Sequence, residues 1–125
     1  MREILFRGKD QNEKWIYGCY TGTAFDYYYI AVPMAENDGW AMMPVSLNTV
    51  GQFTGLTDKN DNKIFEGDII KNEYEENEYQ YFKVFYNEKK LQWEIMNKYG
   101  MRGILANVIG KMEVIGNIFD NPNLL

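Results

Sequence analysis

The chain has 125 residues, of which 46% are hydrophobic and 16% aromatic, and this composition indicates a folded, strand-rich globule rather than a disordered chain. Its formal charge of −5 works against nucleic-acid binding, because the Lys and Arg residues are scattered along the sequence. Without histidine and with a single cysteine, the sequence excludes His-dependent catalytic triads and zinc sites built from histidine or several thiolates.

A β-hairpin is predicted near the N-terminus, where two strand-like runs flank a polar turn. A third strand is predicted to stop at Pro33, and turn residues at 36–39 precede a short fourth strand. Residues 44–49 are predicted to be irregular or to form one helical turn. The predicted strands of this part are residues 3–7, 15–20, 27–32 and 40–43.

The most sharply patterned stretch is residues 50–70. Aromatic and β-branched residues on both sides of a polar cluster predict two strands joined near Asn60 and Asp61, because Asn and Asp tolerate the left-handed conformation of tight turns. If these two residues are central to the turn, Leu56 lies opposite Phe65. Three glycines in strand-like sequence predict bulges or bends, as when a small sheet curls onto itself: Gly51, Gly55 and Gly67.

After residue 70 the chain becomes acidic and polar, and residues 71–79 are predicted to be an exposed loop or the tips of two strands. A hairpin of strands 81–86 and 91–96 is predicted next, with Leu91, Trp93 and Ile95 on one face of its second strand. The remaining expectations are one or two helical turns at 104–108, a last strand at 112–119 with a bulge at Gly116, and a stop at Pro122.

The polar cluster at 58–62 does not have the full pattern of a calcium-binding loop. Oxygen-bearing side chains at positions 58, 60 and 62 resemble the start of an EF-hand calcium loop, but Lys63 and Ile69 replace its glycine and its terminal acid. An enzyme acting through two of the 18 Asp and Glu residues is a further hypothesis, which requires two acids converging in a pocket. Acidic residues on surface strands more often only contact solvent, and no complete catalytic or metal-binding motif is present. We therefore expect no enzyme activity, with no catalytic, metal-binding or cofactor-binding residues and no cofactor.

Aromatic residues outside the patterned stretch are the candidate interaction surface. Such rings can stack on single-stranded nucleic acid or on a Pro-rich peptide, although a nucleic-acid groove normally has basic flanks. Packing in a sheet core is the favoured alternative for Trp93 and for the tyrosine run at 27–29, and any exposed remainder suits a subunit interface. The candidate residues are Tyr27, Tyr28, Tyr29, Trp40, Tyr74 and Tyr79.

Compartment and membrane contact follow from the cysteine and the hydropathy pattern. Cys19 is alone, which favours a reducing, cytoplasmic setting, and it is predicted to be a small buried hydrophobe. The N-terminus lacks the apolar core and cleavage site of a signal peptide, and no window approaches the ~18 apolar residues of a membrane span. We expect a cytoplasmic protein without membrane contact.

Three separated segments resemble the YopX family of small proteins encoded by bacteriophages and prophages, and they occur in the family's order. They are residues 2–7, residues 50–70, and residues 114–125 with their Val-Ile-Gly-Asn-Ile-Phe-Asp-Asn-Pro run. Where the family usually has Asn-Gly in the central turn, this chain has Asn60-Asp61. The resemblance implies a β-rich protein with an SH3-like roll, whose motif residues serve as architecture, and it implies no catalytic residues.

Together these observations predict an all-β protein, mainly β with short helical turns, as an SH3-like β-roll or barrel with an N-terminal β-hairpin extension. Residues 1–125 are expected to form one domain, with an N-terminal β meander at 1–49 packed on a roll at 50–125. The expected function is that of a non-enzymatic phage or prophage accessory protein, which contacts other copies of itself and an unknown phage or host protein. The alternative is a nucleic-acid-associated module, or an acidic mimic that binds a host DNA-binding protein.

Overall fold

The structure, a computed structural model, describes residues 2–24, 27–73 and 80–125. It is 54% strand, mostly antiparallel, and the helices with assigned bounds are 3₁₀ turns of three residues, so the predicted all-β class is confirmed. The strands group into two compact units, Met1–Phe53 and Thr54–Leu125. Over the described ranges, no helix is long and apolar enough to cross a membrane.

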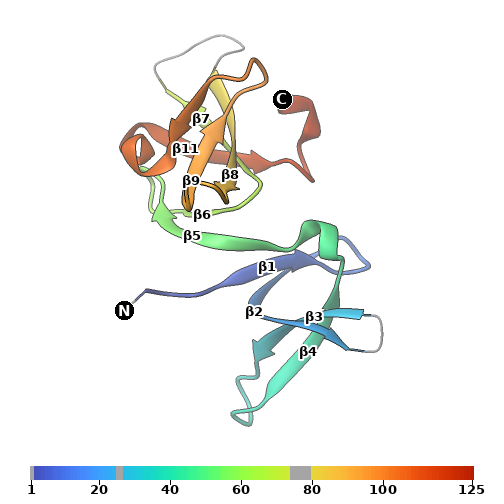
Figure 1. The fold of residues 1–125 in the computed structure, drawn as a ribbon. Coiled ribbons are helices and arrows are strands. Elements are labelled where there is room, and N and C mark those ends of the chain that lie inside the picture. Colours follow the sequence, from blue (N-terminus) through green and yellow to red (C-terminus); the bar gives the residue numbers. More distant parts are fainter. Residues whose placement is uncertain (1, 25–26, 74–79) are drawn as a thin grey trace. The chain divides into compact units, whose positions relative to one another are not determined.

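The first unit is an antiparallel meander (Figure 1). Its elements are β1 (Phe6–Lys9), β2 (Trp15–Ala24), β3 (Tyr27–Pro33), β4 (Trp40–Val45), the 3₁₀ turn η1 (Leu47–Thr49) and the beginning of β5 (Gly51–Thr57). The strands lie in the order β4-β3-β2-β1, and the first residues of β5 pair with β1 on its other side. The predicted N-terminal hairpin is therefore confirmed, and it continues into two further strands.

Buried and exposed side chains alternate along these strands, so the sheet of the first unit has one buried face. Ile16, Ile30 and Val45 form its core, and Tyr28 and Met43 are among the partly buried residues packed against it. Strand β2 pairs with β1 as far as residue 18 and with β3 from residue 19 onward. The strand therefore passes from one neighbour to the other at a glycine, which is typical of a tight bend in a curled sheet.

The second unit contains the rest of β5, a five-stranded antiparallel sheet and, among the elements with assigned bounds, three 3₁₀ turns (Figure 1). Its elements after β5 are β6 (Lys63–Phe65), β7 (Asp68–Asn72), β8 (Tyr81–Asn87), β9 (Gln92–Met96), β10 (Arg102–Ile104), η3 (Leu105–Asn107), η4 (Ile109–Lys111), β11 (Met112–Asn117) and η5 (Pro122–Leu124). The five-stranded sheet has the order β10-β9-β8-β7-β11.

The core of the second unit gathers buried residues from most of these elements. Trp93 packs against it while partly buried, so the predicted role of this ring in sheet packing is confirmed. Leu105 is completely buried, which explains why the chain turns inward at η3 after β10 ends. The buried members of this core are Ile64, Ile70, Phe82, Val84, Ile95, Leu105 and Met112.

The second of the two strands predicted in residues 50–70 is divided by a tight turn into β6 and β7. Gly67 has a φ of 87°, in the left-handed region that favours glycine, which confirms the bend predicted there. The buried carboxylate of Asp68 accepts a 2.8 Å hydrogen bond from the amide of Phe65 across the turn. The turn is thus stabilised by a side chain that faces inward and by a glycine at its tip.

Replacing this glycine is expected to weaken the second unit. In Gly67→Ala the new Cβ would lie 3.3 Å from the ring of Phe119 with φ at 87°, so we expect a loss of about 1–2 kcal/mol in the free energy of unfolding. Urea denaturation followed by the amide NMR signals of β7 and β8 measures this loss. Gly110→Ala is the control, because nothing lies within 4 Å of its added Cβ. Equal stabilities of the two variants would contradict the prediction.

Three further local predictions are corrected. Strand β1 covers Phe6–Lys9 instead of residues 3–7, because its pairing with β2 uses backbone groups and extends through the polar Lys9. Leu91 does not share a face with its predicted neighbours: its φ is 54° and it is 74% exposed, in a turn that the Asn87 side chain closes by accepting the amide of Lys89. Strand β10 lies in a stretch for which no strand was predicted.

The turn between β5 and β6 differs from the predicted two-residue turn. The amide of Asp58 donates to the carbonyl of Asn62 at 2.9 Å and Asp61 has a φ of 63°, so residues 59–61 form a three-residue loop. The condition under which Leu56 would lie opposite Phe65 is therefore not met. The turn still uses an Asp in the left-handed conformation, as the sequence indicated.

Strand β11 carries the predicted bulge. Its register against β7 shifts between Val114 and Gly116, and the strand ends at Asn117, earlier than predicted. The side-chain oxygen of Asn117 accepts the amides of Phe119 and Asp120 at 3.0 and 2.8 Å, which turns the chain away from the sheet. The two sheets are compatible with an SH3-like roll, which stays a prediction, as does the packing of residues 1–49 on residues 50–125.

Candidate protein-interaction surface

Alternate residues of β4 carry exposed apolar side chains. Trp40 and Met42 are 60% and 49% exposed, and Pro44 is exposed as well, whereas Val45 is buried in the core of the first unit. Because residues two apart in a strand share a face, the three exposed residues form one row on the side opposite the core.

Strand β3 extends this row across the sheet. The pairing of the two strands places Pro33 opposite Trp40 and Tyr29 opposite Pro44. Tyr27, at the start of β3, is 59% exposed, and its ring centroid lies 6.4 Å from that of Tyr29. Neither strand contains a charged residue. We call the outward side of β3 and β4 the outer face: Tyr27, Tyr29, Pro33, Trp40, Met42 and Pro44.

Four of the six residues predicted from the sequence fall on these two strands. Tyr27 and Trp40 are exposed on the outer face, and Tyr29 is partly buried there. Tyr28 points to the other side and packs against the core of the first unit. The last two candidates, Tyr74 and Tyr79, lie outside the described residues.

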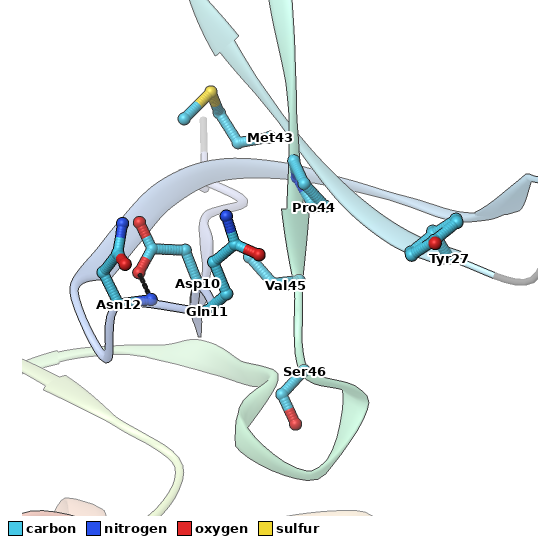
Figure 2. Close-up of a pocket in the computed structure, with 8 residues that line it drawn as sticks. All are labelled: Asp10, Gln11, Asn12, Tyr27, Met43, Pro44, Val45 and Ser46. Carbon is cyan, nitrogen blue, oxygen red and sulfur yellow. Dashed lines mark hydrogen bonds between the residues drawn. The ribbon is translucent and has the colours of Figure 1, made fainter.

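A pocket of about 430 Å³ opens beside the end of β4, within the first unit (Figure 2). One side of it is apolar, and the other comes from the turn between β1 and β2. The carboxylate of Asp10 in that turn accepts the amides of Asn12 and Lys14, both at 2.9 Å, so this acid shapes the turn. The lining residues are Asp10, Gln11, Asn12, Tyr27, Met43, Pro44, Val45 and Ser46.

The chemistry of the pocket is suited to binding. Asp10 is the single acid in its lining and is already hydrogen-bonded, so the pocket offers no pair of carboxylates for acid–base work. Over residues 2–24, 27–73 and 80–125, no three His, Cys, Asp or Glu side chains come close enough together to hold a metal ion. An apolar pocket bordered by polar groups, among them an acid whose Oδ1 already accepts two backbone amides, fits an inserted apolar or aromatic side chain.

The sequence did not reveal this pocket, because its walls come from segments far apart in the chain. The amide of Ser46 donates to the carbonyl of Lys9 at 2.8 Å, and the amide of Lys9 donates to the hydroxyl of Thr49 at 2.8 Å, which brings the end of β1 to η1. One local signal was present: a proline within an apolar strand, here Pro44, marks an edge strand.

Cys19 is exposed, so the prediction that it is a small buried hydrophobe is wrong. The reason lies in the parity of β2, where Ile16 and Gly18 are on the buried face and Tyr17 and Cys19 point the other way.

Comparisons with known proteins identify the family of this chain. No curated protein matches the chain. The family model described as YopX protein matches residues 3–125, nearly the entire sequence. This chain therefore belongs to the YopX family.

Proposed function

We propose that this YopX-family chain is a non-enzymatic phage or prophage accessory protein that acts in the host cytoplasm through protein–protein contacts, first of all with a second copy of itself. The observation that carries the proposal is the outer face, an apolar and uncharged surface on a chain of charge −5. The phage setting is supported by the family resemblance, and the cytoplasmic setting by the single cysteine.

Strand β4 offers an edge on which a second strand can pair. Among the described strands it stands at the end of the sheet, with β3 on one side. The amide of Met34 donates to the carbonyl of Gly39 at 2.8 Å, which sets the alternation of the β3–β4 ladder. The backbone groups of Trp40, Met42 and Pro44 therefore point away from β3, and Pro44 has no N–H to donate.

A second copy of β4 satisfies this edge when two chains meet antiparallel about a two-fold axis at Met42. Each Met42 amide then donates to the Met42 carbonyl of the other copy, and each Trp40 amide donates to a Pro44 carbonyl. Such an isologous pair closes after two chains, and a proline on the edge opposes further strand addition.

The same pairing places an anchor side chain, Trp40, of each copy next to the pocket of the other copy. Trp40 of one copy falls beside Pro44 of the other, and Pro44 lines the pocket of the first unit. Tryptophan is one of the residue types enriched at interface hot spots, which cluster in well-packed pockets. Because β3 and β4 carry no charge, two acidic chains can meet here without opposed like charges on these strands.

The available area sets the expected affinity. Taking about 200 Å² for each full side chain, the exposed parts of Trp40, Met42 and Tyr27 amount to on the order of 300 Å² per copy. With the backbone edge and the two prolines, two copies approach the low end of specific interfaces, about 1,200 Å² in total. We therefore expect a reversible dimer with a dissociation constant in the micromolar range.

Sedimentation equilibrium of the wild-type chain and of Trp40→Glu tests this proposal. The substitution removes the anchor and places two new negative charges near the two-fold axis, so we expect dimerisation to weaken at least tenfold. Leu91→Glu is the matched control, since it makes the same kind of change at a residue of the second unit that is 74% exposed. It is expected to dimerise like the wild type.

Two outcomes would overturn the dimer. The first is a wild-type chain that stays monomeric through the micromolar range, and the second is unchanged dimerisation in Trp40→Glu. A monomer that binds single-stranded oligonucleotides with an affinity that falls steeply with salt would instead support the nucleic-acid alternative. A monomer that binds no DNA but captures a basic DNA-binding protein would support the acidic mimic.

A further inference from the structure

The pocket beside the end of β4 has an open hydrogen-bond acceptor on its polar side. The turn between β1 and β2 uses one oxygen of Asp10, because Oδ1 accepts the amides of Asn12 and Lys14, both at 2.9 Å. Figure 2 shows the other oxygen, Oδ2, turned away from the bond to Asn12. Within the described part of the chain, nothing donates a hydrogen bond to Oδ2. The pocket therefore contains a carboxylate oxygen that is available to a ligand.

The other side of this pocket is apolar. Tyr27, Met43, Pro44 and Val45 contribute ring and aliphatic surface to its lining. Its volume of about 430 Å³ lies within the range usual for small-molecule pockets, about 300–1,000 Å³, so a bicyclic aromatic ring has room. An apolar ring that carries one N–H donor would match both the apolar side and the acceptor. The indole of tryptophan has this combination, since its Nε1–H is a donor only.

Trp40 is an exposed indole whose N–H has no protein acceptor. The side chain is 60% exposed, and its Nε1–H donates to nothing among the described residues. Along β4 it lies four residues from Pro44, about 13 Å at ~3.3 Å per residue, which keeps it out of the pocket of its own chain. The β4 pairing with a second copy brings it beside that copy's pocket instead. An indole N–H that becomes buried normally has an acceptor, because leaving it unpaired is costly.

We propose that this pocket is an indole site, in which Oδ2 of Asp10 accepts the Nε1–H of a tryptophan, and that its occupant is Trp40 of a second copy. The choice of occupant rests on the proposed dimer, whereas the match between pocket and indole does not. The hydrogen bond is charge-assisted, because its acceptor is a carboxylate. It makes Asp10 a specificity-determining residue, since an inserted ring without an N–H leaves the carboxylate without a donor.

Titration of the full chain with indole, and in parallel with 1-methylindole, tests the pocket by ¹H–¹⁵N NMR. Trp40→Glu is the host protein, because it has no tryptophan in β4 to compete for the pocket. We expect indole to shift the backbone amides of residues 10–12 and 45–46 and to saturate, with a dissociation constant in the millimolar range. The second probe has the same ring system without the N–H, so we expect it to bind about tenfold more weakly.

Asp10→Asn, added to the same host, separates the acceptor from the fold. The amides of Asn12 and Lys14 keep the side-chain oxygen toward the turn, so the new NH₂ group takes the place of Oδ2. This variant is expected to bind indole about tenfold more weakly and 1-methylindole as before. Asp61→Asn removes the same charge from an exposed residue of the second unit, and it is expected to bind both probes like the host.

The indole site is overturned if the two probes bind the host equally well, or if Asp10→Asn and Asp61→Asn weaken indole binding to the same extent. It is also overturned if N-acetylargininamide binds more tightly than indole, because that result would identify a site for cations.

Sedimentation equilibrium of Asp10→Asn in the otherwise wild-type chain tests the occupant. We expect dimerisation to weaken about tenfold, with Asp61→Asn unchanged. A dimer of unchanged strength in Asp10→Asn would overturn Trp40 as the occupant and leave the dimer proposal standing. A wild-type monomer whose pocket binds indole through Asp10 would overturn the dimer and the occupant, and would support the indole site.

Discussion

Asp58→Ala is expected to lower the free energy of unfolding of the second unit by about 3 kcal/mol, because it removes a charged acceptor that several buried groups share. Asp58 is 4% exposed. Its Oδ1 accepts the amides of Asn60 and Asn62, both at 2.9 Å, and its Oδ2 accepts the amide of Val114 at 2.8 Å. The Nδ2 group of Asn62 donates a fourth bond, at 3.2 Å.

The effect is large because these bonds join distant parts of the chain. The amides of Asn60 and Asn62 belong to the β5–β6 turn, whereas Val114 lies in β11, 56 residues away in sequence. In Asp58→Ala, the loss leaves the turn without its internal acceptor and β11 without one of its anchors. Asp58→Asn keeps the size of the side chain but turns an NH₂ group toward a donor, so it is expected to be nearly as destabilising.

The pKa of Asp58 adds a pH dependence to this prediction. Burial raises the pKa, but the hydrogen bonds from Val114, Asn62 and Asn60 together outweigh it and hold the pKa below its usual 3.8. A folded-state pKa below the unfolded-state pKa means that the carboxylate stabilises the fold above the unfolded-state pKa and loses this effect as the pH falls through the folded-state pKa. The difference between wild type and Asp58→Ala should therefore be constant near neutral pH and shrink below about pH 4.

Urea denaturation followed by the amide NMR signals of β7 and β8, near neutral pH and below about pH 4, measures both parts of the prediction. Lys59→Ala is the control from the same turn. Its ion pair with Glu73, at 2.7 Å, joins side chains that are 30% and 37% exposed, so its loss is expected to cost far less stability than the loss of the Asp58 carboxylate. Equal effects of Asp58→Ala and Lys59→Ala would show that the carboxylate is not a structural anchor.

Sequence patterns located most strands of this fold but not the points at which they end. The apolar residues around 64–70 suggested one strand, because β-branched and aromatic residues occur on both sides of the turn at Gly67. That turn depends on the inward carboxylate of Asp68 and on long-range bonds, in which Gly67 donates to Val84 and accepts from Ile118, both at 2.9 Å. Neither contact leaves a periodic signal in the sequence.

The candidate surface was predictable in composition but not in geometry. Three consecutive tyrosines carry no alternation of their own, so the sequence could not show that Tyr28 faces the core while Tyr27 and Tyr29 face outward. The buried Ile30 sets that parity in the folded chain.

Gly18→Ala is expected to be the most damaging single change in the first unit, at about 3 kcal/mol, the upper end of the usual cost of overpacking. A Cβ at this position would collide with the backbone carbonyl oxygen of Ala31 and lie 3.0 Å from Cγ2 of Ile30, which is completely buried. Because the obstacle is backbone, a rotamer change cannot relieve it. Strand β2 must then separate from β3 at the point where its pairing passes from β1 to β3.

Amide hydrogen exchange can show which of the two units loses stability in Gly18→Ala. In Gly18→Ala, the amides of β2 and β3 are expected to exchange faster by a factor that corresponds to the lost stability, while those of β7 and β8 keep their protection. Gly22→Ala is the control in the same strand, because its φ of 83° is strained for alanine while nothing lies within 4 Å of the added Cβ. It should cost about 1–2 kcal/mol from conformation alone. If Gly22→Ala proved the more damaging variant, the close approach of β3 at Gly18 would not be the main constraint on the stability of the first unit.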